Sequence, residues 1–233
     1  MPTNGIVIAI DGPASSGKGT VAKNVARTLG YAYIDTGAMY RSVALLAIEQ
    51  GLAFSNAESI SSLATHMDFR FHWNGNELRV EVRTRGEEWN DVTTALRAEE
   101  VGRGASDVAT IPGVRAALLG LQRNLAAAGG VVMDGRDIGS VVLPNADLKV
   151  FLDANIVARA KRRHQELAQR GEMVAYDTVL EEISSRDAQD TQRHAAPLAH
   201  AEDAMYLDTT HMSAQMAAER LVTIARKLAL ELT

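Results

Sequence analysis

The chain has 233 residues and a formal net charge of −5, which is long enough for one or two domains with a sizeable core. The acidic balance argues against a broad nucleic-acid-binding face, and the lack of cysteine excludes disulfides and thiolate chemistry. No apolar run approaches the length of a membrane span, and residues 1–4 lack the basic and apolar regions of a signal peptide. We therefore expect a cytoplasmic protein that binds neither nucleic acid nor membranes.

A glycine-bearing segment follows the first apolar run, residues 6–10. It fits Gly-x-x-x-x-Gly-Lys, a phosphate-binding loop in which a strand turns into a helix whose N–H groups and lysine face phosphate oxygens. The apolar spacing after Lys18, closed by Gly30, predicts that helix and disfavours the alternative of an ordinary glycine-rich turn. The predicted nucleotide-binding residues are Gly12, Pro13, Ala14, Ser15, Ser16, Gly17, Lys18, Gly19 and Thr20.

Further strand and helix patterns follow along the chain. Short apolar strands are expected at 31–34, 131–137, 148–152 and 204–207, with helices between them and a last helix from Ser213. Five strands alternating with helices predict an α/β protein. The expected architecture is the P-loop three-layer fold, with a five-stranded parallel sheet, an inserted antiparallel β-ribbon and a helical lid.

The expected ribbon, about 66–92, interrupts the strand–helix alternation. Apolar and polar residues alternate on both sides of Asn74-Gly75, which predicts a hairpin. Its interleaved arginines and glutamates fit either a nucleic-acid-binding face or a solvated ribbon of mixed charge, and we favour the solvated ribbon. The flanking segments 52–64 and 94–109 show no clear pattern.

Charged residues gather where the expected strands end. Arg41 follows the second strand, and Asp134, Arg136 and Asp137 end the third. Ligands bind at the carboxyl ends of strands in open α/β sheets, so a binding site competes here with a structural ion network.

Two arginine-rich helical stretches lie between the fourth and fifth strands. Arg159, Arg162 and Arg163 share one helix face, and Arg186, Asp190 and Arg193 share another. This spacing suits an anion site and a salt-bridge chain equally well. A phosphate loop beside a second arginine-lined anion pocket would equip the protein for phosphoryl transfer, which needs positioning and charge neutralisation. A nucleotide-dependent switch is the alternative from another class, and it would not need the second pocket.

Four segments in this order resemble the bacterial cytidylate kinases, a group of nucleoside monophosphate kinases. They are residues 10–13, 35–41, 134–139 and 186–193, and the resemblance covers nearly the whole chain. It implies ATP as phosphoryl donor, Mg²⁺ held mainly by phosphates and water with no direct protein ligand, and CMP or dCMP as acceptor. Kinases for UMP, AMP or another acceptor are the nearest alternatives. Small kinases of this kind are often monomeric, and we expect a monomer.

The resemblance also implies roles for individual residues. Lys18 and the lid residues Arg159, Arg162 and Arg163 would act on the transferred phosphate. The acceptor residues would be Thr36, Arg41, Ser106, Arg115, Arg136, Asp137, Arg186, Asp190 and Arg193. Ser106, Arg115 and Asp137 match the positions that read cytosine, whose amino group suits a carboxylate, whereas uracil presents a carbonyl there.

The expected domains follow the same assignment. Residues 1–37 and 105–233 would form the kinase core, with the lid at about 155–172. Residues 38–104 would form the acceptor-nucleotide-binding region that carries the ribbon.

Overall fold

The computed structural model describes residues 5–192, 198 and 200–232. The larger sheet is five-stranded, in the order β2-β6-β1-β7-β8, and a second sheet has the order β3-β4-β5. These sheets confirm the expected α/β fold with a separate antiparallel ribbon. The chain divides into two compact units, one made of residues 1–31 and 129–233 and the other of residues 32–128.

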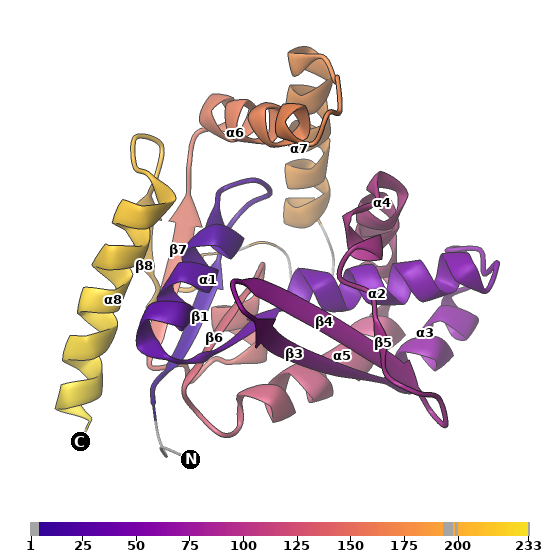
Figure 1. Ribbon diagram of the computed structural model, residues 1–233, viewed down its shortest axis with the longest axis horizontal. Coiled ribbons are helices and arrows are strands. Elements are labelled where there is room, and N and C mark those ends of the chain that lie inside the picture. The colour runs from indigo at the N-terminus through magenta and orange to yellow at the C-terminus, as the bar shows by residue number, and fades with distance from the viewer. Residues whose placement is uncertain (1–4, 193–197, 199, 233) are drawn as a thin grey trace. The chain divides into compact units, whose positions relative to one another are not determined.

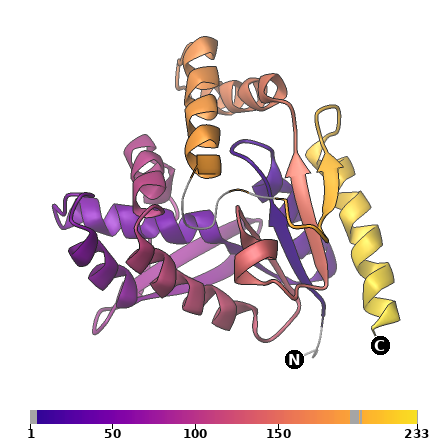
Figure 2. The ribbon, with the colours of Figure 1, turned by 180° about the vertical axis from the view of Figure 1, so that it is seen from behind.

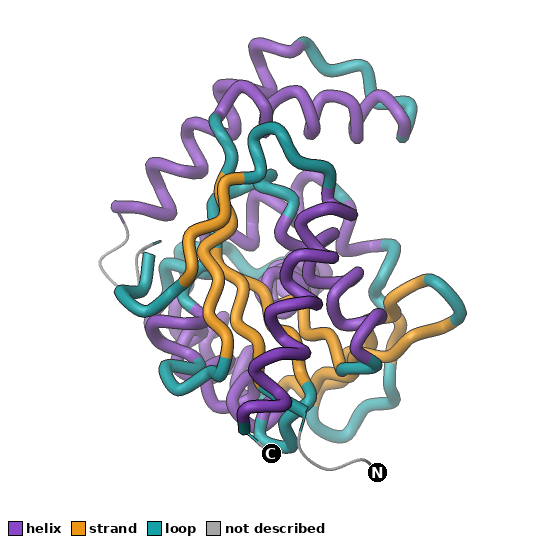
Figure 3. Tube along the Cα trace, turned by 90° about the vertical axis from the view of Figure 1, so that its left-hand side faces the viewer, coloured by secondary structure: helices purple, strands orange, loops and turns teal. Residues whose placement is uncertain are grey.

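The first unit contains four parallel strands that lie side by side (Figure 3). They are β1 (Val7–Asp11), β6 (Val131–Gly135), β7 (Leu148–Asp153) and β8 (Met205–Asp208). Strands β1 and β6 are buried along almost their whole length, as expected for central parallel strands with both faces covered. The register pairs Asp11 with Gly135 and with Phe151, so that β1 and β6 end level with each other while β7 continues to Asp153.

The helices of this unit follow the predicted pattern. They are α1 (Lys18–Leu29), α6 (Ile156–Gln169), α7 (Tyr176–Gln192) and α8 (Ala214–Glu231), with a short π-helix η2 (Ile138–Val142). Helices α1 and α8 pack against each other beside the sheet (Figures 1 and 2). Gly30 ends α1 in the left-handed conformation, and the Ser213 hydroxyl caps α8 by accepting a hydrogen bond from the Met216 N–H.

Helices α6 and α7 share a small apolar core of their own, formed by Ala160, Leu167, Val179 and Ile183. Tyr176 and Leu180 of α7 pack against this cluster while remaining partly exposed. Figure 1 shows the pair beyond the end of β7. Helix α6 occupies the segment that the sequence predicts as the lid.

The second unit holds the ribbon and the helices around it. Its elements are β2 (Ala32–Asp35), α2 (Thr36–Glu49), α3 (Ala57–Thr65), β3 (Met67–Asn74), β4 (Glu77–Thr84), β5 (Asn90–Asp91), the 3₁₀-helix η1 (Ala95–Arg97), α4 (Glu99–Val108) and α5 (Pro112–Ala126). Asn74 pairs with Glu77, which confirms the hairpin and its two-residue turn. Gly75 has φ +58°, a value that suits glycine in such a tight turn.

Two helices and one strand of this unit were not predicted. Helices α3 and α4 fall in the segments without a clear pattern, because each is short and contains only two large apolar residues, too few to reveal their helical spacing. Helix α4 packs closely on α2. A Cβ added at Gly104 would lie 3.1 Å from the Ala44 Cβ of α2 and 2.5 Å from the ring of Phe54, which follows α2, so this close approach favours glycine. Strand β5 has only two residues, too few for a recognisable alternation.

Candidate active site

The phosphate loop connects β1 to α1 in the predicted position. A Cβ added at Gly12 would lie 2.0 Å from the carbonyl oxygen of Leu152, so only glycine fits there. Gly17 has φ +91°, a left-handed conformation that favours glycine, and it directly precedes the first turn of α1. The loop therefore presents backbone N–H groups and a helix N-terminus, the combination that binds phosphate.

Lys18 is almost fully buried, and its ammonium group donates a hydrogen bond to the carbonyl oxygen of Pro13 at 3.0 Å. Burial lowers the pKa of Lys18 to about 7, and the nearby Arg136 acts in the same direction. Asp134 and Asp190 oppose this shift. A bound phosphate would add negative charge beside the ammonium group and favour its charged form.

Arg159 lies under the loop and is buried. Its Nε donates to the carbonyl oxygen of Ala154 at 2.9 Å, and its Nη1 donates to that of Ala14 at 3.0 Å. The same Nη1 lies 2.6 Å from a carboxylate oxygen of Asp187 on α7. Arg159 thus connects the phosphate loop to the start of α6 and to α7.

Arg162 binds the other side of the loop. Its Nη1 donates to the carbonyl oxygen of Ser16 at 3.1 Å, and its Nη2 donates to the carbonyl oxygens of Thr209 and Met212. Burial lowers the pKa of Arg162, while the charge of Asp208 opposes the shift. Two guanidinium groups therefore occupy carbonyl oxygens of the loop, an arrangement that leaves its N–H groups suited to an anion.

A hollow of about 290 Å³ adjoins the loop within the first unit. It is lined by the loop, by Arg162, Arg163 and Glu166 of α6, and by the β8–α8 connection. The Ser16 hydroxyl is buried in the loop and has no hydrogen-bond partner in the structure. This hollow has room for part of a nucleotide whose phosphates lie in the loop.

Other predicted residues of the first unit gather near Lys18. Arg136 Nε lies 2.6 Å from a carboxylate oxygen of Asp190, which joins the end of β6 to α7. Arg186 is close enough to Lys18 for its charge to lower the pKa of that lysine further. Asp137 is buried, and it lies between the end of β6 and the start of η2. The predicted residue Arg193 lies outside the described residues.

The predicted residues of the second unit gather around the start of α2. The Asp35 carboxylate caps α2 through the Ala38 N–H at 2.8 Å and pairs with Arg41 at 2.9 Å. Thr36 is buried as the first residue of α2. Arg115 of α5 donates to the Tyr40 hydroxyl at 3.3 Å, and Ser106 lies on α4, which packs on α2. Within this unit, Arg41 and Arg115 are therefore both brought to the first turns of α2.

Several residues that hold these groups in place were not predicted individually. Asp187 pairs with Arg159, Asp35 pairs with Arg41, and Thr209 accepts from Arg162. Asp35 and Asp187 lie inside the recognised segments 35–41 and 186–193. The sequence therefore points to these residues, but it does not reveal which arginine each one contacts. The sequence does not indicate a role for Thr209, because its backbone carbonyl oxygen accepts from Arg162 only where the fold brings the two residues together.

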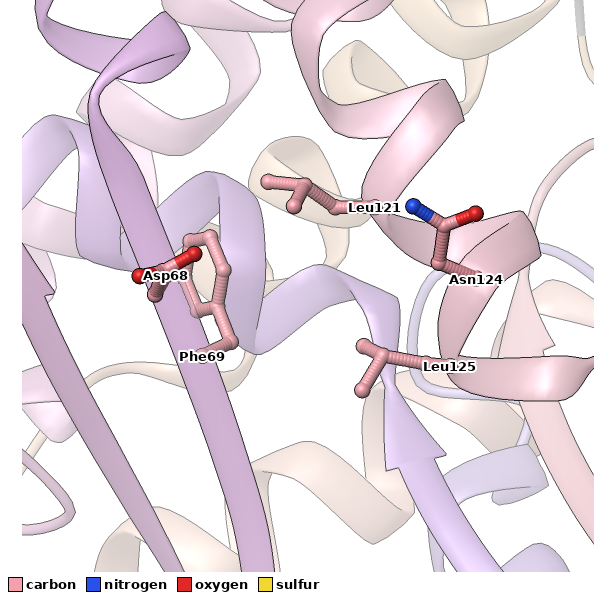
Figure 4. A pocket seen from close by; sticks show the side chains of 5 residues that line it. All are labelled: Asp68, Phe69, Leu121, Asn124 and Leu125. Atoms are coloured by element: carbon pink, nitrogen blue, oxygen red, sulfur yellow. The ribbon is translucent and has the colours of Figure 1, made fainter.

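A second hollow, of about 200 Å³, lies between β3 and α5 of the second unit (Figure 4). Phe69, Leu121 and Leu125 supply an apolar lining, and Asp68 and Asn124 lie at its border. It contains none of the predicted site residues. Within the described part of the chain, no helix combines the length and the apolar character needed to cross a bilayer.

Comparison with known proteins gives the family. The model of the family described as cytidylate kinase matches residues 8–227. The chain belongs to the cytidylate kinase family. A cytidylate kinase of an Exiguobacterium strain is 48% identical over 218 residues, which cover 92% of this chain and 95% of that protein. A cytidylate kinase of Pseudomonas savastanoi pv. phaseolicola is 46% identical and covers 93% of each chain.

A solved structure of an uncharacterised Eubacterium ventriosum protein is similar in fold, with a TM-score of 0.51 at 12% identity. The alignment covers 96% of this chain and 99% of that one. Family membership extends over both units, since the matched residues include the phosphate loop, α2, the ribbon and α7.

Proposed function

We propose that the protein transfers the γ-phosphoryl group of ATP to CMP or dCMP, which gives ADP and CDP or dCDP. The observation that carries this proposal is the buried Lys18 inside a phosphate loop, in a chain that belongs to the cytidylate kinase family. The arginines that recur at the end of β6 and on α2, α6 and α7 support an anionic acceptor.

This reaction requires that the two substrates be positioned and that the negative charge of their phosphates be neutralised. An oxygen of the acceptor phosphate attacks the γ-phosphorus of ATP, and the bond from that phosphorus to the β-bridging oxygen breaks. The acceptor oxygen is already anionic, so it needs no general base. Lys18 would stabilise the charge on the donor phosphates, and Arg162 and Arg163, which line the adjoining hollow, would bind the donor side. Arg159 would act on the transferred phosphate or hold the loop that binds it.

Mg²⁺ would enter with the donor, bound mainly by phosphate oxygens and water. Asp134 fits a contact through water, because its carboxylate is buried at the end of β6 and its charge acts on Lys18. When bound, the ion would neutralise part of the phosphate charge.

We assign two groups of residues to the acceptor. Arg41, Arg136, Arg186 and Arg193, with Thr36, would bind its phosphate and the nearby atoms, and Asp190 would bind the sugar hydroxyls. Ser106, Arg115 and Asp137 would read cytosine. A carboxylate that faces the cytosine amino group would be left beside a carbonyl in UMP, so discrimination should be substantial. With a net charge of −5, we also expect no nucleic-acid partner, and a cytoplasmic monomer remains our proposal.

The test is ADP formation from ATP and Mg²⁺ with CMP, dCMP, UMP and AMP offered separately, beside a control without acceptor. Turnover with CMP and dCMP alone supports both the reaction and the base-reading residues. Preference for another nucleotide would retain the kinase chemistry and reject the cytosine assignment. Hydrolysis that needs no acceptor would favour a nucleotide-dependent switch instead.

A further inference from the structure

The carboxylate of Asp11 binds two successive backbone N–H groups of another loop. Asp11 is the last residue of β1, and it is buried. Its Oδ1 accepts from the Ile138 N–H and its Oδ2 accepts from the Gly139 N–H, both at 2.8 Å. Both carboxylate oxygens are thus used to hold the two residues that follow Asp137.

Hydrogen bonds within η2 also restrain this turn. The carbonyl oxygen of Asp137 accepts from the N–H groups of Val141 and Val142 at 2.9 and 3.1 Å, within the π-helix η2. A π-helix is a rare element that is often found at functional sites. Asp137 is therefore fixed through its own carbonyl by η2 and through the next two N–H groups by Asp11.

The space around Gly139 has room for a Cβ but not for a larger side chain. A Cβ added at Gly139 would lie 3.4 Å from the Asp11 Oδ2 and 3.3 Å from the Lys149 side chain. Lys149 is itself held, because its ammonium group lies 2.6 Å from the Asp203 carboxylate. The turn is confined on one side by the Asp11 carboxylate and on another by the Lys149 stem.

The backbone of Asp11 continues directly into Gly12, the first residue of the phosphate loop. We propose that Asp11 is a positioning residue that holds the base-reading Asp137 in register with the phosphate loop, and so determines discrimination between cytosine and uracil. This inference rests on the proposed function, since it takes Asp137 to read the acceptor base. Burial raises the pKa of Asp11 to about 6, so the carboxylate is mostly ionised at neutral pH and accepts both hydrogen bonds.

Two kinds of variant disturb this arrangement: one changes the Asp11 carboxylate, and the other changes the turn that it binds. Asp11→Asn keeps one acceptor oxygen and turns an amide N–H₂ toward the second backbone donor, while Asp11→Ala removes both acceptors. Gly139→Val leaves Asp11 intact and adds two methyl groups beyond a Cβ that already lies 3.3 Å from the Lys149 side chain and 3.4 Å from the Asp11 Oδ2, so the turn must shift. Asp147→Asn is the matched control, because the Asp147 carboxylate accepts from the Val7 N–H at 2.7 Å, at the opposite end of β1.

The experiment measures kcat/KM for CMP and for UMP, KM for ATP, and thermal unfolding, in the full-length protein. We expect Asp11→Asn and Gly139→Val to lower the CMP-to-UMP ratio about tenfold and Asp11→Ala to lower it further, because small misplacements of a substrate-binding group are costly. KM for ATP should change less than about threefold, since the loop's own contacts remain. Asp147→Asn should leave the ratio unchanged.

An unchanged ratio in every folded variant, with activity lost only in proportion to stability, would show that Asp11 merely supports the fold. A rise in KM for ATP with the ratio intact would also overturn the proposal. If no Asp11 variant folds, Gly139→Val decides by itself. A wild-type protein without preference for CMP would instead reject the proposed function, before any variant is compared.

Discussion

Lys18 carries the largest predicted effect of any single residue. Its side chain is buried along the loop and ends 3.0 Å from the Pro13 carbonyl oxygen. Lys18→Met keeps an apolar stem of similar length and removes the charge that faces the phosphates. We expect kcat to fall by about two to four orders of magnitude, or about 3 to 5 kcal/mol of transition-state stabilisation. Arg27→Ala, an exposed cation on the same helix, is the control for steady-state kinetics.

The lowered pKa of Lys18 predicts proton uptake when the donor binds. Above pH 7 the ammonium group of the free protein is increasingly deprotonated, whereas donor phosphates favour its charged form. ATP affinity should therefore weaken as pH rises from 7 toward 9. Calorimetry at pH 8 in buffers of different ionisation enthalpy should detect this uptake in the wild type. The same uptake in Lys18→Met would assign the proton to another group.

The sequence indicated which residues carry charge but not which groups they contact. Lys18 and Gly17 follow from the loop motif, because that motif specifies backbone geometry. The contacts of Arg159 with Ala14 and Asp187 could not be predicted, since they join segments far apart in the chain. Asp11 stood inside a recognised segment, but its hydrogen bonds to residues 138 and 139 depend on the pairing of β1 with β6.

At the scale of elements, Arg159 ties the loop, α6 and α7 together. Replacing it with methionine leaves the partly buried Asp187 carboxylate without its cation, so we expect a loss of about 3 kcal/mol in the free energy of unfolding. Asp187→Asn in the same chain should recover part of that loss, as urea denaturation of the four combinations would show. Additive losses would mean that the two side chains do not interact energetically.

Arg163→Ala provides the comparison for that measurement. Arg163, which is partly exposed, pairs with the exposed Glu166 on α6 at 3.2 Å. Exposed pairs of this kind contribute about 0.5 kcal/mol or less, so its effect on unfolding should be small. An effect as large as that of Arg159→Met would mean that burial does not explain the difference.

Strands and long helices were easier to predict from the sequence than short helices. The five parallel strands and the hairpin were expected within a residue or two, because strong apolar runs bounded by turn residues identify them. Helices α3 and α4 were missed because each contains only two large apolar residues. The π-helix η2 was missed because it depends on hydrogen bonds that the spacing of residues does not reveal. The Asp137 carbonyl oxygen accepts from two N–H groups of η2, and the distant Asp11 carboxylate accepts from two others.

At the scale of the whole molecule, the residues assigned to the donor belong to the first compact unit, whereas those assigned to the acceptor come from both units. Lys18 lies in the first unit and Arg41 in the second. A ligand at 100 times its Kd adds about 2.7 kcal/mol to the stability of the folded state, a shift of several degrees in Tm for a chain of this size. Lys18→Met should lose most of the shift caused by an ATP analogue and keep the shift caused by CMP.

Arg41→Met should show the opposite pattern in the same thermal-shift measurement. Its loss should reduce the CMP-induced shift, because Arg41 is assigned to the acceptor, and leave the shift from the ATP analogue nearly intact. If Arg41→Met abolishes both shifts, the assignment of Arg41 to the acceptor alone is wrong.

The small core shared by α6 and α7 has a consequence for local stability. Four buried side chains hold this pair together, far fewer than hold the parallel sheet. Backbone amides in α6 and α7 should therefore exchange with solvent deuterium through local opening, while those of β1 and β6 exchange only when the whole unit unfolds. Arg159 and Arg162 both raise the free energy of that opening, because their hydrogen bonds to Ala14 and Ser16 must break before the pair can leave the loop.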